Sequence, residues 1–169
     1  MKNMSNSSHT MTHTLSHSMT EPKEILIMLI IMFIAGLLSS MNVWVDKLSD
    51  MRFHLNDVYM SLLMCGWSLI LMGIYYINPT ILLVGILFTF IILYCIRNQL
   101  FIDESQYLKG MIPHHSMAVL MSKELLKKAY NRDIDIYVSK DTKILSNNII
   151  NSQNHEINIM KSVLQDKII

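Results

Sequence analysis

Histidine and methionine gather in one short segment of the chain. Residues 111–117 read Met-Ile-Pro-His-His-Ser-Met, and Met121 follows one helical turn later. On a helix, at about 100° per residue, these side chains face largely one side. Thioethers select Cu(I), and imidazole suits copper and zinc, so His and Met ligands without a carboxylate favour copper, as Cu(I), or Ag(I). The candidate metal ligands in this segment are Met111, His114, His115, Met117 and Met121.

Three further candidates lie near the end of the chain. Gln153, Glu156 and Met160 share one face of a predicted helix. Met160 would complete the ligand set from the opposite side. Glu156 and Gln153 would support the ligands, with Glu156 orienting a ligating imidazole.

The first 22 residues have a separate His- and Met-rich composition. They are rich in Ser, Thr and Asn, so we expect residues 1–22 to be disordered. Such a tail could wrap a soft cation, or its histidines and methionines could be incidental. The possible tail ligands are His9, Met11, His13, His17 and Met19.

A structural interpretation of the central cluster stays open beside the metal site. Methionine fills gaps in protein cores, and a Met stripe at helical spacing is more often packing than ligation. Two adjacent histidines on the same segment, His114 and His115, shift the balance toward a metal.

Three apolar runs must position these residues. Of the 169 residues, 51% are hydrophobic and 16% are charged. The net charge of +1 provides no strong positive electrostatic field that would attract nucleic acid. The runs 25–45, 58–77 and 80–96 are long enough to cross a bilayer as helices. They contain no ionisable residue, which argues for an anchor over an ion path. We predict an all-α protein with a tail at 1–22, a membrane region at 23–101 and a helical metal-binding domain at 102–169.

The last 68 residues are predicted to form a helical hairpin. A first helix has apolar residues at helical spacing, and a second helix follows the turn signal at 131–133. Two helices alone bury too little apolar surface to be stable. We therefore expect a homodimer through 102–169 that completes a four-helix bundle. The expected inner positions of the first helix are Leu108, Met111, Ala118, Met121, Leu125 and Leu126.

These residues resemble a known family. The string Met111-Ile112-Pro113-His114-His115, together with Gln153-x-x-Glu156-Ile157-x-x-Met160, is similar to the "domain of unknown function 305" family over about residues 103–165. The resemblance implies a ferritin-like four-helix bundle, copper binding and copper tolerance, in a membrane-anchored member. It marks Met111, His114, His115, Met121, Glu156 and Met160. Ser116-Met117 departs from the Gln-Gly that the family usually has there.

The favoured function is a membrane-anchored copper-binding protein for copper sequestration, tolerance or transfer, with a copper transporter or chaperone as a possible partner. A di-metal enzyme would need Glu-x-x-His motifs, which the C-terminal domain lacks, and no catalytic motif stands elsewhere, so we expect no enzyme. The alternative is a structural or regulatory membrane protein with a ferritin-like domain and no metal role.

The sequence gives only a weak indication of which side of the membrane the C-terminal domain faces. Lys47, Arg52 and Arg97 lie on the domain's side and Lys2 and Lys23 on the tail's side, which slightly favours a cytoplasmic domain. The family resemblance favours the exterior. We expect an extracytoplasmic C-terminal domain.

Overall fold

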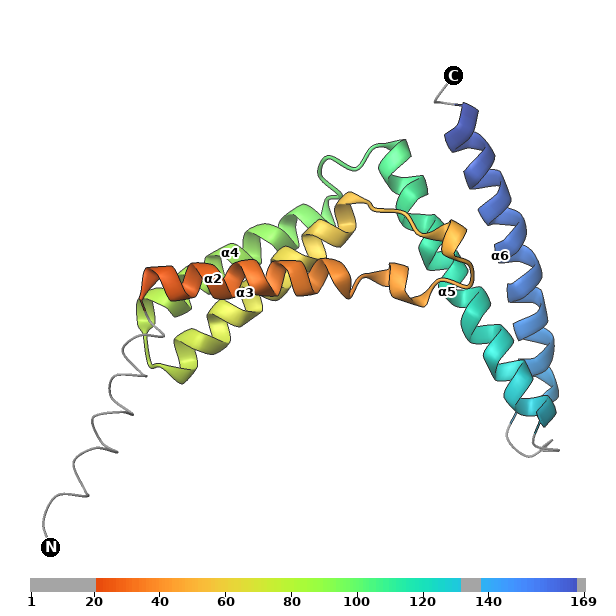
Figure 1. The fold of residues 1–169 in the computed structure, drawn as a ribbon, viewed down its shortest axis with the longest axis horizontal. Helices are drawn as coiled ribbons and strands as arrows, with labels where there is room; N and C mark the ends of the chain where they lie inside the picture. Colours follow the sequence, from red (N-terminus) through yellow and green to blue (C-terminus); the bar gives the residue numbers. More distant parts are fainter. Residues whose placement is uncertain (1–20, 132–137, 167–169) are drawn as a thin grey trace, which may run out of the picture. The chain divides into compact units, whose positions relative to one another are not determined.

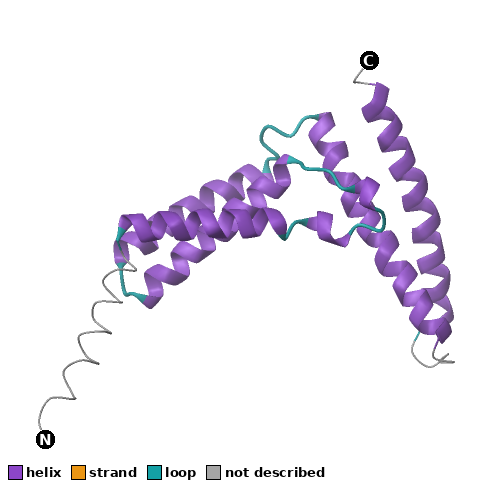
Figure 2. Ribbon diagram, in the orientation of Figure 1, coloured by secondary structure: helices purple, strands orange, loops and turns teal. Residues whose placement is uncertain are grey.

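The computed structural model describes residues 21–131 and 138–166, and within them the chain is all helical (Figures 1 and 2). The five α-helices confirm the predicted all-α class. They form two compact units, one from α2 and most of α3 and α4, the other from residues 39–57, α5 and α6. The elements are α2 (Pro22–Leu38), η1 (Met41–Trp44), η2 (Leu48–Asp50), α3 (Leu55–Tyr75), α4 (Pro79–Arg97), α5 (Glu104–Asn131) and α6 (Lys140–Asp166).

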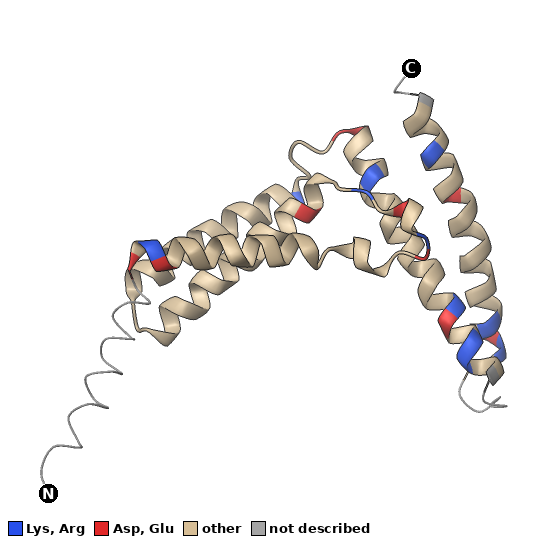
Figure 3. Ribbon diagram, in the orientation of Figure 1, with Lys and Arg blue, Asp and Glu red and all other residues tan. Residues whose placement is uncertain are grey.

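Three segments are long and apolar enough to cross a membrane, as predicted. They are Pro22–Trp44, Leu55–Tyr75 and Pro79–Arg97. Lys, Arg, Asp and Glu stand near the ends of these helices and leave their middles free of charge (Figure 3). Large apolar side chains along these helices, such as Ile31, Leu71 and Phe90, are exposed, which is consistent with a membrane protein.

Asn78 and Pro79 define the turn between α3 and α4. The Oδ1 atom of Asn78 accepts hydrogen bonds from the backbone N–H groups of Thr80 and Ile81, at 3.1 and 3.2 Å. Pro79 is the first helical residue, where its missing N–H costs nothing. The cap therefore fixes where α4 begins.

Close helix contact in the first unit depends on glycine. A Cβ added at Gly73 of α3 would lie 2.5 Å from the backbone nitrogen of Leu82 in α4. Since a backbone atom cannot rotate away, only glycine allows this approach of the two helices.

In the second unit α5 and α6 lie side by side with opposite chain directions (Figure 1). Helix α5 runs without a break through Pro113. The core between the helices contains Leu108, Ile112 and Val119 of α5 with Ile157 and Met160 of α6.

The segment 39–57 also belongs to this second unit, whereas the sequence assigned it to a membrane region at 23–101. Both short 3-10 helices of the segment pack against α5. The N–H of Asp46 donates to Oγ of Ser116 at 2.9 Å, and the N–H of Leu55 donates to Oε1 of Gln106 at 2.8 Å. Polar side chains of α5 thus satisfy backbone groups that this irregular segment cannot pair internally.

Candidate metal-binding site

The clearest polar contact between α5 and α6 joins a histidine and a glutamate. Nδ1 of His115 lies 2.9 Å from Oε2 of Glu156, and the two side chains are 12% and 46% exposed. This nitrogen is buried and has no aligned hydrogen bond among the described residues. Because Nδ1 of His115 faces the Glu156 carboxylate, Nε2 is the ring nitrogen that remains available to bind a ligand.

Two methionines lie one turn away from this pair. In antiparallel helices, one turn back from His115 on α5 leads to Met111, and one turn forward from Glu156 on α6 leads to Met160. The structure agrees with this register, since Met160 is 8% exposed in the core cluster and Met111 packs against the same cluster. One imidazole, one carboxylate and two thioethers therefore occupy two adjacent levels of the helix pair.

Other predicted site residues lie outside this group. His114 is exposed, with its ring centroid 6.1 Å from that of His115. Met121 is 59% exposed and does not take the inner position that its spacing predicted, because the neighbouring Ile112 and Val119 fill the core. Met117 and Gln153 are half-buried. The five tail candidates, His9, Met11, His13, His17 and Met19, lie outside the described residues.

The surroundings of His115 favour a neutral imidazole. Burial lowers the pKa of His115 below its ordinary value, the Glu156 carboxylate partly offsets this, and His114 adds to the lowering. A neutral ring is the form that binds a metal.

The donor set fits a soft ion better than a hard one. Across residues 21–131 and 138–166, no three His, Cys, Asp or Glu side chains come together as a metal-binding group. The thioethers of Met111 and Met160 and the imidazole of His115 are donors that suit Cu(I).

A second polar cluster, which the sequence reasoning missed, lies on the next positions of both helices. Asp50 of η2 is 2% exposed and accepts a hydrogen bond from Oγ of Ser116 at 2.6 Å. Lys161 forms an ion pair with the same carboxylate. The polar composition of residues 46–57 was the only signal in the sequence, since no local spacing links Asp50 to residues over 60 positions away.

Charge compensation holds Asp50 in its ionised form. Burial alone would raise the pKa of Asp50, but hydrogen bonds from Lys161 and Ser116 lower it below its ordinary value. The segment 39–57 is therefore fastened to both α5 and α6 by one carboxylate.

His54 is a further buried polar group in the segment 39–57. It is 5% exposed, and its ring faces Gly110 of α5, where an added Cβ would lie 3.5 Å from Nδ1. Nε2 lies 3.4 Å from Oδ1 of Asp57. Burial lowers the pKa of His54, and the charge of Asp57 partly opposes this.

Comparison with known proteins identifies the C-terminal helices. Residues 102–164 match the family described as "Domain of unknown function (DUF305)". The chain therefore contains a DUF305 domain over these residues. An uncharacterized protein of Acanthamoeba polyphaga mimivirus is 45% identical over 150 residues, which covers 85% of this chain and 92% of that protein. No solved structure matches the chain.

The match to DUF305 covers the whole candidate site. Met111, His115, Glu156 and Met160 all lie within residues 102–164. Asp50 and His54 lie before the matched region, although they pack in the same unit as α5 and α6. The second unit therefore combines the family's helices with a segment that this chain adds from between its apolar helices.

Proposed function

We propose that the protein is a membrane-anchored copper-binding protein, which sequesters or hands on Cu(I) without catalytic turnover. His115 would bind the ion through Nε2, with Met111 and Met160 as thioether ligands. Glu156 would hold the imidazole in position. The bound ion would supply no chemistry beyond its own coordination, so the protein's part is to bind and release it.

One observation carries this proposal. The imidazole of His115 stands between two helices, with Nδ1 2.9 Å from Glu156, and both methionines of the core cluster lie one turn away. A histidine in a purely apolar interface would cost free energy without a compensating partner. A ring oriented by a carboxylate beside two thioethers has the arrangement that a soft ligand set requires.

The apolar helices α2–α4 would cross the bilayer and hold the second unit at its surface. We also propose that this unit pairs with a second copy to form a ferritin-like four-helix bundle. Large apolar side chains on α5 and α6 remain exposed and support such pairing. They include Tyr107, Met121, Ile144, Leu145 and Ile159, which are 48–59% exposed.

The second unit would face the exterior of the cell. A reporter that is active only in the cytoplasm, fused after Ile169, should then be silent, and the same reporter fused before Met1 should be active. A positive signal from the C-terminal fusion would refute this orientation.

The test of copper binding is an anaerobic titration of the full chain in detergent with Cu(I) against a competing chelator. The His115→Gln/Met160→Leu variant keeps similar side-chain volumes and should lose binding. Glu156→Gln should weaken binding by roughly 10- to 100-fold, since it removes only the group that orients the ring. X-ray absorption of the bound ion should show sulfur neighbours that the Met160→Leu variant loses in part.

Two controls separate the core site from other donors. Met121→Leu changes an exposed methionine and should leave the affinity unchanged. Replacing the five tail candidates with Ser removes any copper held by the N-terminus. Equal binding by the wild type and the His115→Gln/Met160→Leu variant, both without tail ligands, would contradict the proposal.

A structural role is the second candidate function. It is favoured by the burial of Met160 and by the Asp50–Ser116–Lys161 cluster, both of which stabilise the unit without a metal. In that case the double variant would change stability but not copper affinity, and the protein would act through its membrane and protein contacts.

A further inference from the structure

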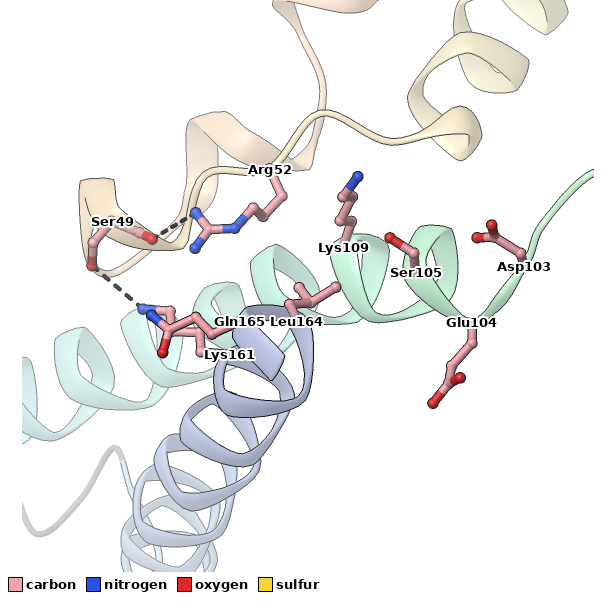
Figure 4. A pocket seen from close by; sticks show the side chains of 9 residues that line it. All are labelled: Ser49, Arg52, Asp103, Glu104, Ser105, Lys109, Lys161, Leu164 and Gln165. Carbon is pink, nitrogen blue, oxygen red and sulfur yellow. Dashed lines mark hydrogen bonds between the residues drawn. The ribbon is translucent and has the colours of Figure 1, made fainter. Parts of the chain in front are cut away.

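The second unit has an open pocket that the metal site does not use. Its volume is about 880 Å³, and the segment 39–57, α5 and α6 all line it (Figure 4). Arg52 enters from the segment, Lys109 from α5 and Lys161 from α6. Three cationic side chains from three separate elements thus surround one space.

Two of these cations have donors to spare. The Nη1 group of Arg52 donates to the carbonyls of Ser49 and Met51, at 2.8 and 2.7 Å, which holds the guanidinium in place. Its Nε and Nη2 donors remain, because a guanidinium carries five N–H groups. The Lys109 ammonium group makes no hydrogen bond or ion pair within the described part of the chain. Lys161 is neutralised by Asp50 and contributes less.

Asp103 and Glu104 also line the pocket and offset part of its positive charge, but among the described residues neither forms an ion pair with Arg52 or Lys109. Oδ1 of Asp103 accepts the N–H of Gln106 at 2.7 Å and so caps the start of α5. The Glu104 side chain points away from Lys109 and Arg52 in Figure 4. Hydroxyl groups of Ser49 and Ser105 line the same space. Guanidinium, ammonium and hydroxyl donors together form the usual environment of a phosphate group.

The pocket residues lie close in sequence to the apolar helices, which makes lipid headgroups one source of a phosphate group. Arg52 precedes the apolar helix Leu55–Tyr75 by three residues, and Asp103 follows the apolar helix Pro79–Arg97 by six residues. Three to six residues of chain span at most about 20 Å. If those helices cross a bilayer, the pocket residues lie within reach of the lipid headgroups.

We propose that this pocket binds a phosphate group, from a phospholipid headgroup or from a soluble phosphate. Arg52 grips two oxygens as a fork and Lys109 supplies a point charge. The site is separate from the copper proposal and does not depend on it.

The test is calorimetric titration of the full chain in a neutral detergent with two probes, dihexanoyl phosphatidic acid and inorganic phosphate. The Lys109→Gln variant should bind about tenfold more weakly, as expected for one lost charge-assisted hydrogen bond. Arg52→Gln/Lys109→Gln should abolish binding. The matched control is Lys127→Gln/Lys128→Gln, which removes two exposed positive charges near the other end of α5 and should bind like the wild type.

The two probes separate the sources. Much tighter binding of phosphatidic acid would assign the pocket to a lipid headgroup, and equal binding would assign it to soluble phosphate. Failure of both probes to bind, or equal binding by the control and the Arg52→Gln/Lys109→Gln variant, would overturn the proposal. Lys109→Gln breaks no side-chain hydrogen bond or ion pair among the described residues, so we expect little change in folding from this variant.

Discussion

The helices of the first unit contact one another through small side chains, whereas the second unit holds its parts together with buried charges. In the first unit, glycines such as Gly73 let two backbones approach closely. In the second, Asp50, Ser116 and Lys161 join an irregular segment to two helices. In a bilayer, apolar side chains gain little by leaving lipid, so close packing must hold the helices. In water, a short segment whose apolar side chains, such as Val43, Leu48 and Phe53, stay exposed needs polar contacts instead.

The largest expected effect in this comparison comes from Lys161→Met. It leaves the Asp50 carboxylate, whose side chain is 3% exposed, without its cation. We expect the second unit to lose about 3 kcal/mol of stability, because an unpaired buried charge is costly. Chemical unfolding followed by circular dichroism measures the loss. Lys128→Met, an exposed lysine on α5, should change stability by less than about 0.5 kcal/mol; similar losses in the two variants would contradict the assignment.

The Asp50–Lys161 pair also predicts that the folded protein loses stability at low pH. The pKa of Asp50 is lowered in the folded protein, so its contribution is present above the unfolded pKa of about 3.9 and is lost as the pH falls through the folded pKa. Lys161→Met should lose less stability over that range than the wild type does.

The second largest effect should come from Gly73→Ala. The added Cβ would lie 2.5 Å from a backbone atom of α4, so the helices must separate. We expect a loss of about 2 kcal/mol, within the usual cost of overpacking. Thermal unfolding in detergent measures it.

Gly110→Ala is the paired control in the second unit. Its Cβ would meet the His54 ring at an ordinary 3.5 Å, and alanine favours a helix over glycine by about 1 kcal/mol. Stability should therefore stay equal or rise. If both alanine variants behave alike, glycine does not set the helix spacing in the first unit.

The sequence predicted elements that depend on local pattern. Long apolar runs predicted three helices, because hydrophobicity is a property of each run itself and needs no distant partner. The sequence also brought Met111, His115, Glu156 and Met160 to attention, since their types and spacing are unusual. It could not say which of them meet across the helices.

The inner face of α5 was harder to predict for a physical reason. Helical spacing placed Ala118 and Met121 inside, yet Ile112 and Val119 are fully buried and Met121 is exposed. Helix α5 is covered on one side by α6 and on another by residues 39–57. Helical spacing predicts one buried face when a helix packs against one partner. Helix α5 has a second buried face because residues 39–57, which are distant in sequence, also pack against it.

A smaller effect should come from His54, whose pKa is lowered by burial. The unfolded chain then binds more protons than the folded one below about pH 6.5, so stability falls as the pH falls, by at most about 1.4 kcal/mol per pH unit, and levels off below the folded pKa. His54→Gln should flatten this slope in unfolding measured between pH 7 and 5. His115, whose pKa is also lowered, contributes a slope of the same sign that His115→Gln would remove. An unchanged slope in His54→Gln would mean that His54 titrates normally.

The smallest effect should come from Lys123→Gln, which breaks the other ion pair between an α-helix and the segment 39–57. Nζ of Lys123 lies 2.7 Å from Oδ2 of Asp46, but the lysine side chain is 44% exposed. Water screens such a pair, so we expect a loss of about 0.5 kcal/mol or less. Salt distinguishes the two pairs, because it screens exposed charges far more than buried ones. The loss from Lys123→Gln should vanish at high salt while that from Lys161→Met persists. Equal salt dependence would mean that the Asp50–Lys161 pair is as open to water as the Asp46–Lys123 pair, and that buried charge does not hold the second unit together.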